Sequence, residues 1–109
     1  MAERWLLVAA RAPARHGRAL WDDAAALAAS GAEVTLLMTD DTTSEVATAD
    51  SPAPRLAADG GRVVVDRAAA ARRGLLGRFG SASGGDVQLL DRGAIAALLL
   101  DPDLRTVWR

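Results

Sequence analysis

No cysteine occurs in this chain of 109 residues. The absence excludes disulfide bonds, thiolate metal sites and thiol nucleophiles together. Lysine is absent as well, since all 13 basic residues are arginine, and this excludes a Schiff base or a lysine general base. The single histidine, His16, excludes a multi-histidine metal site, and a Ser-His-Asp triad would depend on that one residue.

Charge and length narrow the class of protein further. The formal net charge is -1, so no global attraction to nucleic acid or to an anionic membrane is expected. Half of the residues are hydrophobic and a quarter are charged, the balance of a folded globular protein. The length suits one domain, and we expect residues 1–109 to form it. The apolar run at residues 5–10 is too short for a signal peptide or a membrane span, so a cytoplasmic location is expected.

Five short apolar or β-branched segments predict β-strands. The first, at residues 5–10, is apolar without alternation, as in a parallel strand that is buried on both faces. The other four lie at residues 33–38, 62–65, 87–90 and 104–108. We expect Trp108, on the last of these strands, to pack in or near the core.

Segments of helical character separate the predicted strands. Within residues 18–30, Leu20, Ala24 and Leu27 share one stripe at helical spacing, and Gly31 is suited to end the helix. Further helices are expected at residues 43–49, 67–73 and 92–100, with one helical turn at residues 55–59. Connections of this length between strands imply right-handed crossovers. The predicted fold is α/β, with three layers (α/β/α) and a five-stranded, mostly parallel sheet.

In such a sheet, ligands bind outside the carboxyl ends of the strands, and several polar residues are expected there. Asp40 and Asp41 follow the second predicted strand, and Asp66 and Arg67 follow the third. The glycine- and serine-rich residues 75–85 are a candidate lid. The sequence therefore predicts one pocket at this rim.

Residues 65–74 read Val-Asp-Arg-Ala-Ala-Ala-Ala-Arg-Arg-Gly, and this turn resembles the third-strand-to-helix turn of the DsrE-like sulfur-relay family, closest to its DsrE and TusD kind of subunit. Those proteins often read Cys-x-Ala-Ala-Ala-x-Arg-Arg-Gly at this place. The likeness extends over most of the chain. It includes the opening strand and amphipathic helix, the Ser-Pro-Ala break at residues 51–53, and the helix at residues 93–98 before a final strand.

The resemblance places Asp66 where the family keeps the cysteine that carries a persulfide. An aspartate cannot hold a persulfide, so the resemblance implies a DsrE-like fold without a catalytic residue, and no cofactor. It also implies assembly into a homotrimer or homohexamer, or a hetero-oligomer with related subunits. The leading hypothesis is a non-catalytic structural or regulatory partner linked to sulfur relay.

The candidate residues each have two interpretations. Asp66 either caps the following helix or, together with Arg67, lines a pocket or binds a partner. Arg72 and Arg73 either interact with the helix C-terminus or form an ion pair between subunits. Trp21 either anchors an interface or packs at the margin of the core.

Two alternative functions remain open on the sequence alone. One is a small-molecule or nucleotide-binding module at the rim around Asp40 and Asp66. The other is an enzyme that uses His16 or Asp66 as acid or base, although no complete catalytic constellation supports it. A hard cation at Asp40 and Asp41 is not expected, because the segment lacks the Asp-x-Asp-x-Asp-Gly pattern and aspartates after a strand usually cap the next helix.

Overall fold

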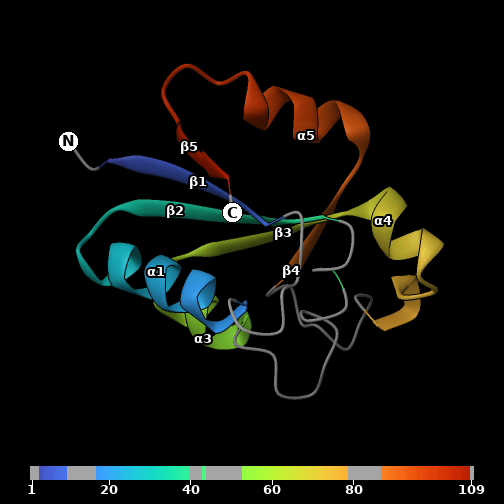
Figure 1. Cartoon of the computed structure of the whole chain (residues 1–109), viewed down its shortest axis with the longest axis horizontal. Coiled ribbons are helices and arrows are strands. Elements are labelled where there is room, and N and C mark those ends of the chain that lie inside the picture. Colours follow the sequence, from blue (N-terminus) through green and yellow to red (C-terminus); the bar gives the residue numbers. More distant parts are fainter. Residues whose placement is uncertain (1–2, 10–16, 40–42, 44–52, 79–86, 109) are drawn as a thin grey trace.

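Five parallel strands form one sheet in the computed structural model, which describes residues 3–9, 17–39, 43, 53–78 and 87–108. The strand order is β4-β3-β2-β1-β5, and every neighbouring pair is parallel (Figure 1). The strands are β1 (Arg4–Ala9), β2 (Glu33–Met38), β3 (Arg62–Asp66), β4 (Val87–Leu90) and β5 (Arg105–Trp108). The prediction of a five-stranded parallel sheet is confirmed, with strand boundaries shifted by one residue or less.

Helices connect the strands in the predicted alternation. They are α1 (Gly17–Ala29), α3 (Ala53–Ala58), α4 (Arg67–Arg72) and α5 (Arg92–Leu99), with a 3₁₀ turn at Leu76–Arg78. The single turn expected at residues 55–59 is a six-residue helix that begins at Ala53. Thr43 is helical, but the rest of the helix expected at residues 43–49 lies outside the described residues.

The helices lie on both faces of the sheet, which gives the three-layer arrangement. Figure 1 shows α5 on one side of the sheet and α1 and α3 on the other. We call the hydrophobic cluster beneath α1 and α3 the α1 core; its buried residues are Leu7, Ala9, Leu20, Trp21, Ala24, Val34, Leu36, Met38, Ala53, Leu56, Val63, Val65, Ala70 and Val87. The cluster beneath α5 is the α5 core; its buried residues are Leu6, Val8, Leu37, Val64 and Leu90.

Strand β1 explains why the apolar runs of this sequence do not alternate. Leu7 and Ala9 lie in the α1 core, whereas Leu6 and Val8 point the opposite way into the α5 core. All four are at most 3% exposed. Because side chains alternate along a strand, a strand with helices on both faces must be apolar at every position. Full burial of each large side chain contributes roughly 1.5–3 kcal/mol.

The edge strand β5 departs from the prediction. Trp108 was expected in or near the core, but it is 62% exposed. The physical reason is its position: β5 is the last strand of the sheet, paired only with β1 among the described residues, and no side chain of α5 is fully buried. Trp21, in contrast, is buried: it is only 8% exposed and belongs to the α1 core.

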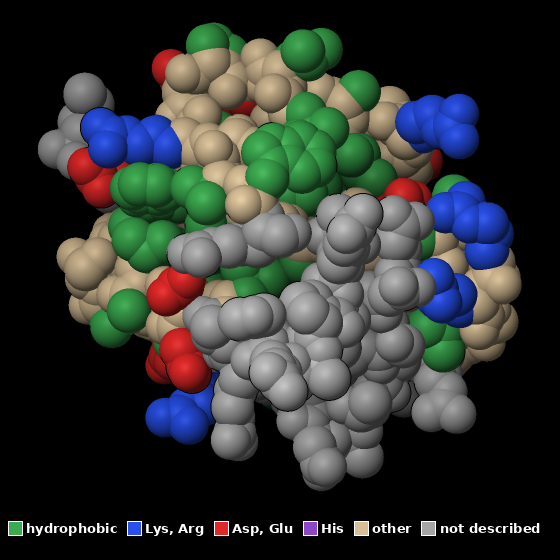
Figure 2. Space-filling view, viewed as in Figure 1, with side chains coloured by type: hydrophobic (Ala, Val, Ile, Leu, Met, Phe, Trp, Pro, Cys, Tyr) green, Lys and Arg blue, Asp and Glu red, His purple; other side chains and the backbone are tan. Residues whose placement is uncertain are grey.

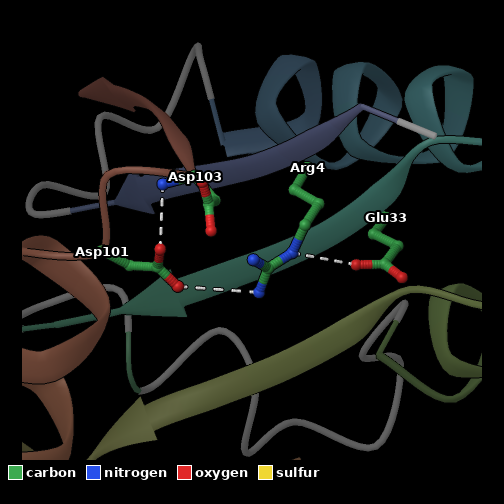
Figure 3. Close-up of polar contacts among 4 residues, drawn as sticks. All are labelled: Arg4, Glu33, Asp101 and Asp103. Atoms are coloured by element: carbon green, nitrogen blue, oxygen red, sulfur yellow. Dashed lines mark hydrogen bonds and ion pairs between the residues drawn. The ribbon is translucent and has the colours of Figure 1, made fainter. Parts of the chain in front are cut away.

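A polar network ties the turn before β5 to the amino ends of the central strands (Figure 3). Arg4 Nε donates to Glu33 Oε2 at 3.1 Å, and a terminal guanidinium nitrogen of Arg4 lies 3.6 Å from Asp101 Oδ2. Asp101 Oδ1 in turn accepts a hydrogen bond from the backbone N–H of Asp103 at 2.9 Å. Exposed ion pairs of this kind contribute about 1 kcal/mol or less each, so the network orients the turn more than it stabilises the fold.

Gly61, between α3 and β3, is a point where the packing tolerates no side chain. A Cβ atom there would lie 2.6 Å from Leu56 Cγ, and Leu56 is 3% exposed within the α1 core. We therefore expect Gly61→Ala to lower the free energy of unfolding by about 1–3 kcal/mol through overpacking. Urea denaturation would measure it. Gly77→Ala is the matched control, because a Cβ there meets nothing within 4 Å; equal effects of the two variants would contradict the packing argument.

Candidate functional site

The predicted rim begins at Asp66, the last residue of β3 and the cap of α4. Its backbone is extended (φ -64, ψ 111), and its carboxylate oxygen Oδ1 accepts hydrogen bonds from the N–H groups of Ala68 at 3.0 Å and Ala69 at 3.4 Å. These are two of the amides that a helix leaves without a partner at its first turn. Of the two interpretations of Asp66, the structure shows the helix cap.

A second aspartate, Asp91, occupies the same position on the neighbouring strand. It follows β4 and caps α5, and its Oδ1 accepts from the N–H of Ala94 at 2.9 Å. Asp66 is in register with Leu90, so the two caps stand at the ends of adjacent strands. The sequence predicts Asp91 as the cap of α5, and the structure confirms it.

The two caps mark the place where the chain changes sides of the sheet. After β3 the chain joins the α1 core through Ala70, Leu75 and Leu76, whereas α5, after β4, packs on the α5 core. In open parallel sheets, the crevice between two strands whose connections leave toward opposite faces is the usual ligand position. The topology therefore places the candidate site between the ends of β3 and β4.

The caps also determine what this crevice can bind. A phosphate at such a place would need free backbone N–H groups and a positive helix end. Here the Asp66 carboxylate already accepts hydrogen bonds from two first-turn amides of α4, and the Asp91 carboxylate accepts one from the first turn of α5. The described rim thus uses these amides to start the two helices, so the capped amides are not available to an anionic ligand.

Arginines form the outer surface of α4, next to Asp66. Arg67 lies in its first turn, and Arg72 and Arg73 lie at its end; all three are exposed. The backbone N–H of Arg73 closes the helix by donating to the carbonyls of Ala69 and Ala70, both at 3.3 Å. Gly74 follows with φ 68, the left-handed conformation that glycine adopts at helix ends.

The remaining candidates do not join this group. Trp21 is buried in the α1 core, so it packs rather than presenting an interface anchor. Asp40, Asp41 and His16 lie outside the described residues, as does most of the 75–85 segment. Among the residues that the structure describes, no group of three histidine or carboxylate side chains is placed to hold a metal ion.

Two hollows in the described surface lie along α1, away from Asp66. One, of about 430 Å³, lies between α1 and α3 and is lined by Trp21, Asp22, Ala25, Ala26, Ala29, Arg55, Leu56 and Asp59. The other, of about 410 Å³, lies between α1 and the β1–β5 pair. We call it the β5 groove; it is lined by Trp5, Leu7, Asp23, Ala26, Leu27, Ser30 and Val107. Neither hollow was expected from the sequence, because each is made by segments far apart in the chain.

Comparison with known proteins assigns no family. No protein-family model matches the chain, and no curated protein matches it either. Within the described ranges, no helix combines the length and apolar character needed to cross a membrane.

The Asp66 cap makes a measurable prediction. Asp66→Ala removes the acceptor of two amides, and we expect a loss of about 1 kcal/mol of unfolding free energy. Asp66→Asn should lose less, because its amide oxygen still accepts. Asp91→Ala is the matched variant for α5 and should show a loss of similar size. Chemical denaturation monitored by circular dichroism would measure all three; an Asp66→Ala protein as stable as the parent would contradict the assigned cap.

Proposed function

We propose that this protein is a non-catalytic DsrE-like subunit that acts as an oligomeric structural or regulatory partner in sulfur relay. One observation carries the proposal. Asp66 stands at the turn between β3 and α4, the place to which the resemblance assigns the family's persulfide-carrying cysteine, and its carboxylate is bonded to the backbone of α4.

The chemistry of the position supports a non-catalytic role. Sulfane-sulfur transfer requires a thiolate, which attacks the donor, forms a sulfur–sulfur bond and releases the donor's leaving group. The chain has no thiol, and the Asp66 carboxylate is engaged in capping. The position therefore serves the fold, while the surrounding surface is left for binding.

The arginine surface of α4 supports a binding role. Arg67, Arg72 and Arg73 are exposed around a short helix beside the rim. Arginine is enriched in protein interfaces because its guanidinium forms planar, bidentate contacts with carboxylates. In this proposal, α4 presents these side chains to an acidic surface of another subunit.

Self-association is the first test. We expect size-exclusion chromatography with light scattering to give a mass of at least two chains at micromolar concentration, since the proposal requires an oligomeric partner. A monomer across the accessible concentration range would count against this half of the proposal, whatever its relation to sulfur chemistry.

Restoring the thiol tests the relation to sulfur relay. We expect Asp66→Cys, incubated with a sulfane-sulfur donor such as polysulfide, to gain the mass of one sulfur atom and to lose it on reduction. Asp91→Cys is the control, because it places a thiol in the same capping geometry on the adjacent strand. Modification of both variants at equal rates, or of neither, would contradict a sulfur-specific environment at position 66.

A further inference from the structure

Among the residues that the structure describes, no strand pairs with the outer edge of β5, and this edge has little protection against pairing. Thr106 and Trp108 are exposed, and Val107 is half-buried beside the β5 groove. Natural edge strands are usually protected by lysine, proline or a bulge. In Arg105–Trp108 the charge is carried by Arg105, whose guanidinium lies 3.5 Å from Glu3 Oε1 and 5.5 Å from the centre of the Trp5 ring. This charge is therefore drawn back toward β1.

The backbone of β5 is oriented for pairing. The carbonyls of Glu3 and Ala9 accept hydrogen bonds from β2, through Glu33 N–H and Thr39 N–H. Backbone groups alternate in direction along a strand, so those of Leu6 and Val8 face β5. The register of Leu6 with Thr106 then turns Arg105 and Val107 toward β1, and directs the backbone groups of Thr106 and Trp108 out of the sheet.

Both faces of this edge are apolar. Val107 borders the β5 groove on the α1 side, together with Trp5, Leu7 and Leu27. On the opposite face, Trp108 is 62% exposed, and Leu104 is a partly buried neighbour of the α5 core. Figure 2 shows hydrophobic side chains gathered in the middle of the visible surface, below the α5 layer. A strand added here would cover apolar surface on both sides.

We propose that the occupant is a second copy of this chain, whose β5 pairs antiparallel with the first about a two-fold axis at Thr106. The inference deepens the proposed function, because it names the surface through which the subunit would assemble. The two sheets then form one continuous sheet. Two or three such dimers would give a tetramer or a hexamer. A strand pair related by a two-fold axis is self-complementary, as closed homodimers require.

Charge and apolar contacts together favour one register of this pairing. Pairing centred on Thr106 sets Arg105 opposite the partner's Val107, and Leu104 opposite the partner's Trp108. Each Arg105 keeps its own Glu3 and Trp5 as neighbours, so its charge stays away from the pairing edge, and the partner's Val107 lies beside it. A register centred on Arg105 would set two like charges directly opposite, which is destabilising. A register centred on Val107 would leave Leu104 without the partner's Trp108.

The position of Thr106 on the axis allows a charge-exchange experiment. Its side chain is exposed, so Thr106→Lys and Thr106→Glu should each fold as the parent does, which circular dichroism would verify. Each alone sets like charges face to face, and we expect dimerisation to weaken by up to about fivefold. An equimolar mixture of the two sets lysine against glutamate and should recover the dimer as a heterodimer. Ala58→Lys, on the exposed surface of α3, adds the same charge elsewhere and should leave the dimer unchanged.

Tryptophan fluorescence supplies an independent measurement. Trp108 is the exposed tryptophan of the described chain, so quenching by acrylamide should fall as the protein concentration rises and the dimer forms. Trp108→Phe should remove most of this change, because Trp21 is buried and Trp5 is already half-buried beside the β5 groove. An oligomer that persists unchanged in Thr106→Lys, or that leaves Trp108 fully open to the quencher, would overturn the β5 interface but leave an oligomeric function intact. A parent protein that is always monomeric would overturn both, whereas failure of the Asp66→Cys test would affect only the relation to sulfur.

Discussion

The structure depends on the burial of its parallel sheet on both faces at once. Strand β1 pairs with β2 on one side and β5 on the other, and its side chains alternate between the α1 core and the α5 core. A polar residue at any of its central positions would therefore face a helix layer and not water. This requirement fixes the helices on opposite sides of the sheet, and the change of side after β3 and β4 creates the rim at which Asp66 and Asp91 lie.

At the rim, two aspartates stabilise helix ends, a position where a thiolate could instead react. A side chain at the end of a buried strand and the start of a helix lies next to free amides, and this environment favours any anionic group, thiolate or carboxylate. In this chain the anionic group is part of the protein at both β3 and β4. The favourable interaction is therefore used permanently for folding, and it is not left for a transient ligand or reaction intermediate.

Local patterns allowed much of this to be predicted, and the limits of those patterns explain the rest. The apolar runs located all five strands, and aspartate after Val65 suggested the cap that the structure contains. Trp21 and Trp108 were placed less well because a helical stripe or a strand period indicates a face within one element only. Leu56 of α3 lies in the same core as Trp21, and Trp108 belongs to β5, which is an edge strand of the sheet. Both facts follow from strand order, which pairs distant segments.

The pairing of β1 with β5 also has a consequence for how the chain reaches this fold. Trp5 is in register with Arg105, so strands from opposite ends of the described chain lie side by side. Contacts of such long sequence separation form late, because a large loop must close before they contribute. Until β5 pairs with it, the apolar strand β1 is an edge strand of the partly folded sheet. A chain released before residue 105 would leave the backbone groups of Leu6 and Val8 that face β5 unpaired, and in that state aggregation competes with folding.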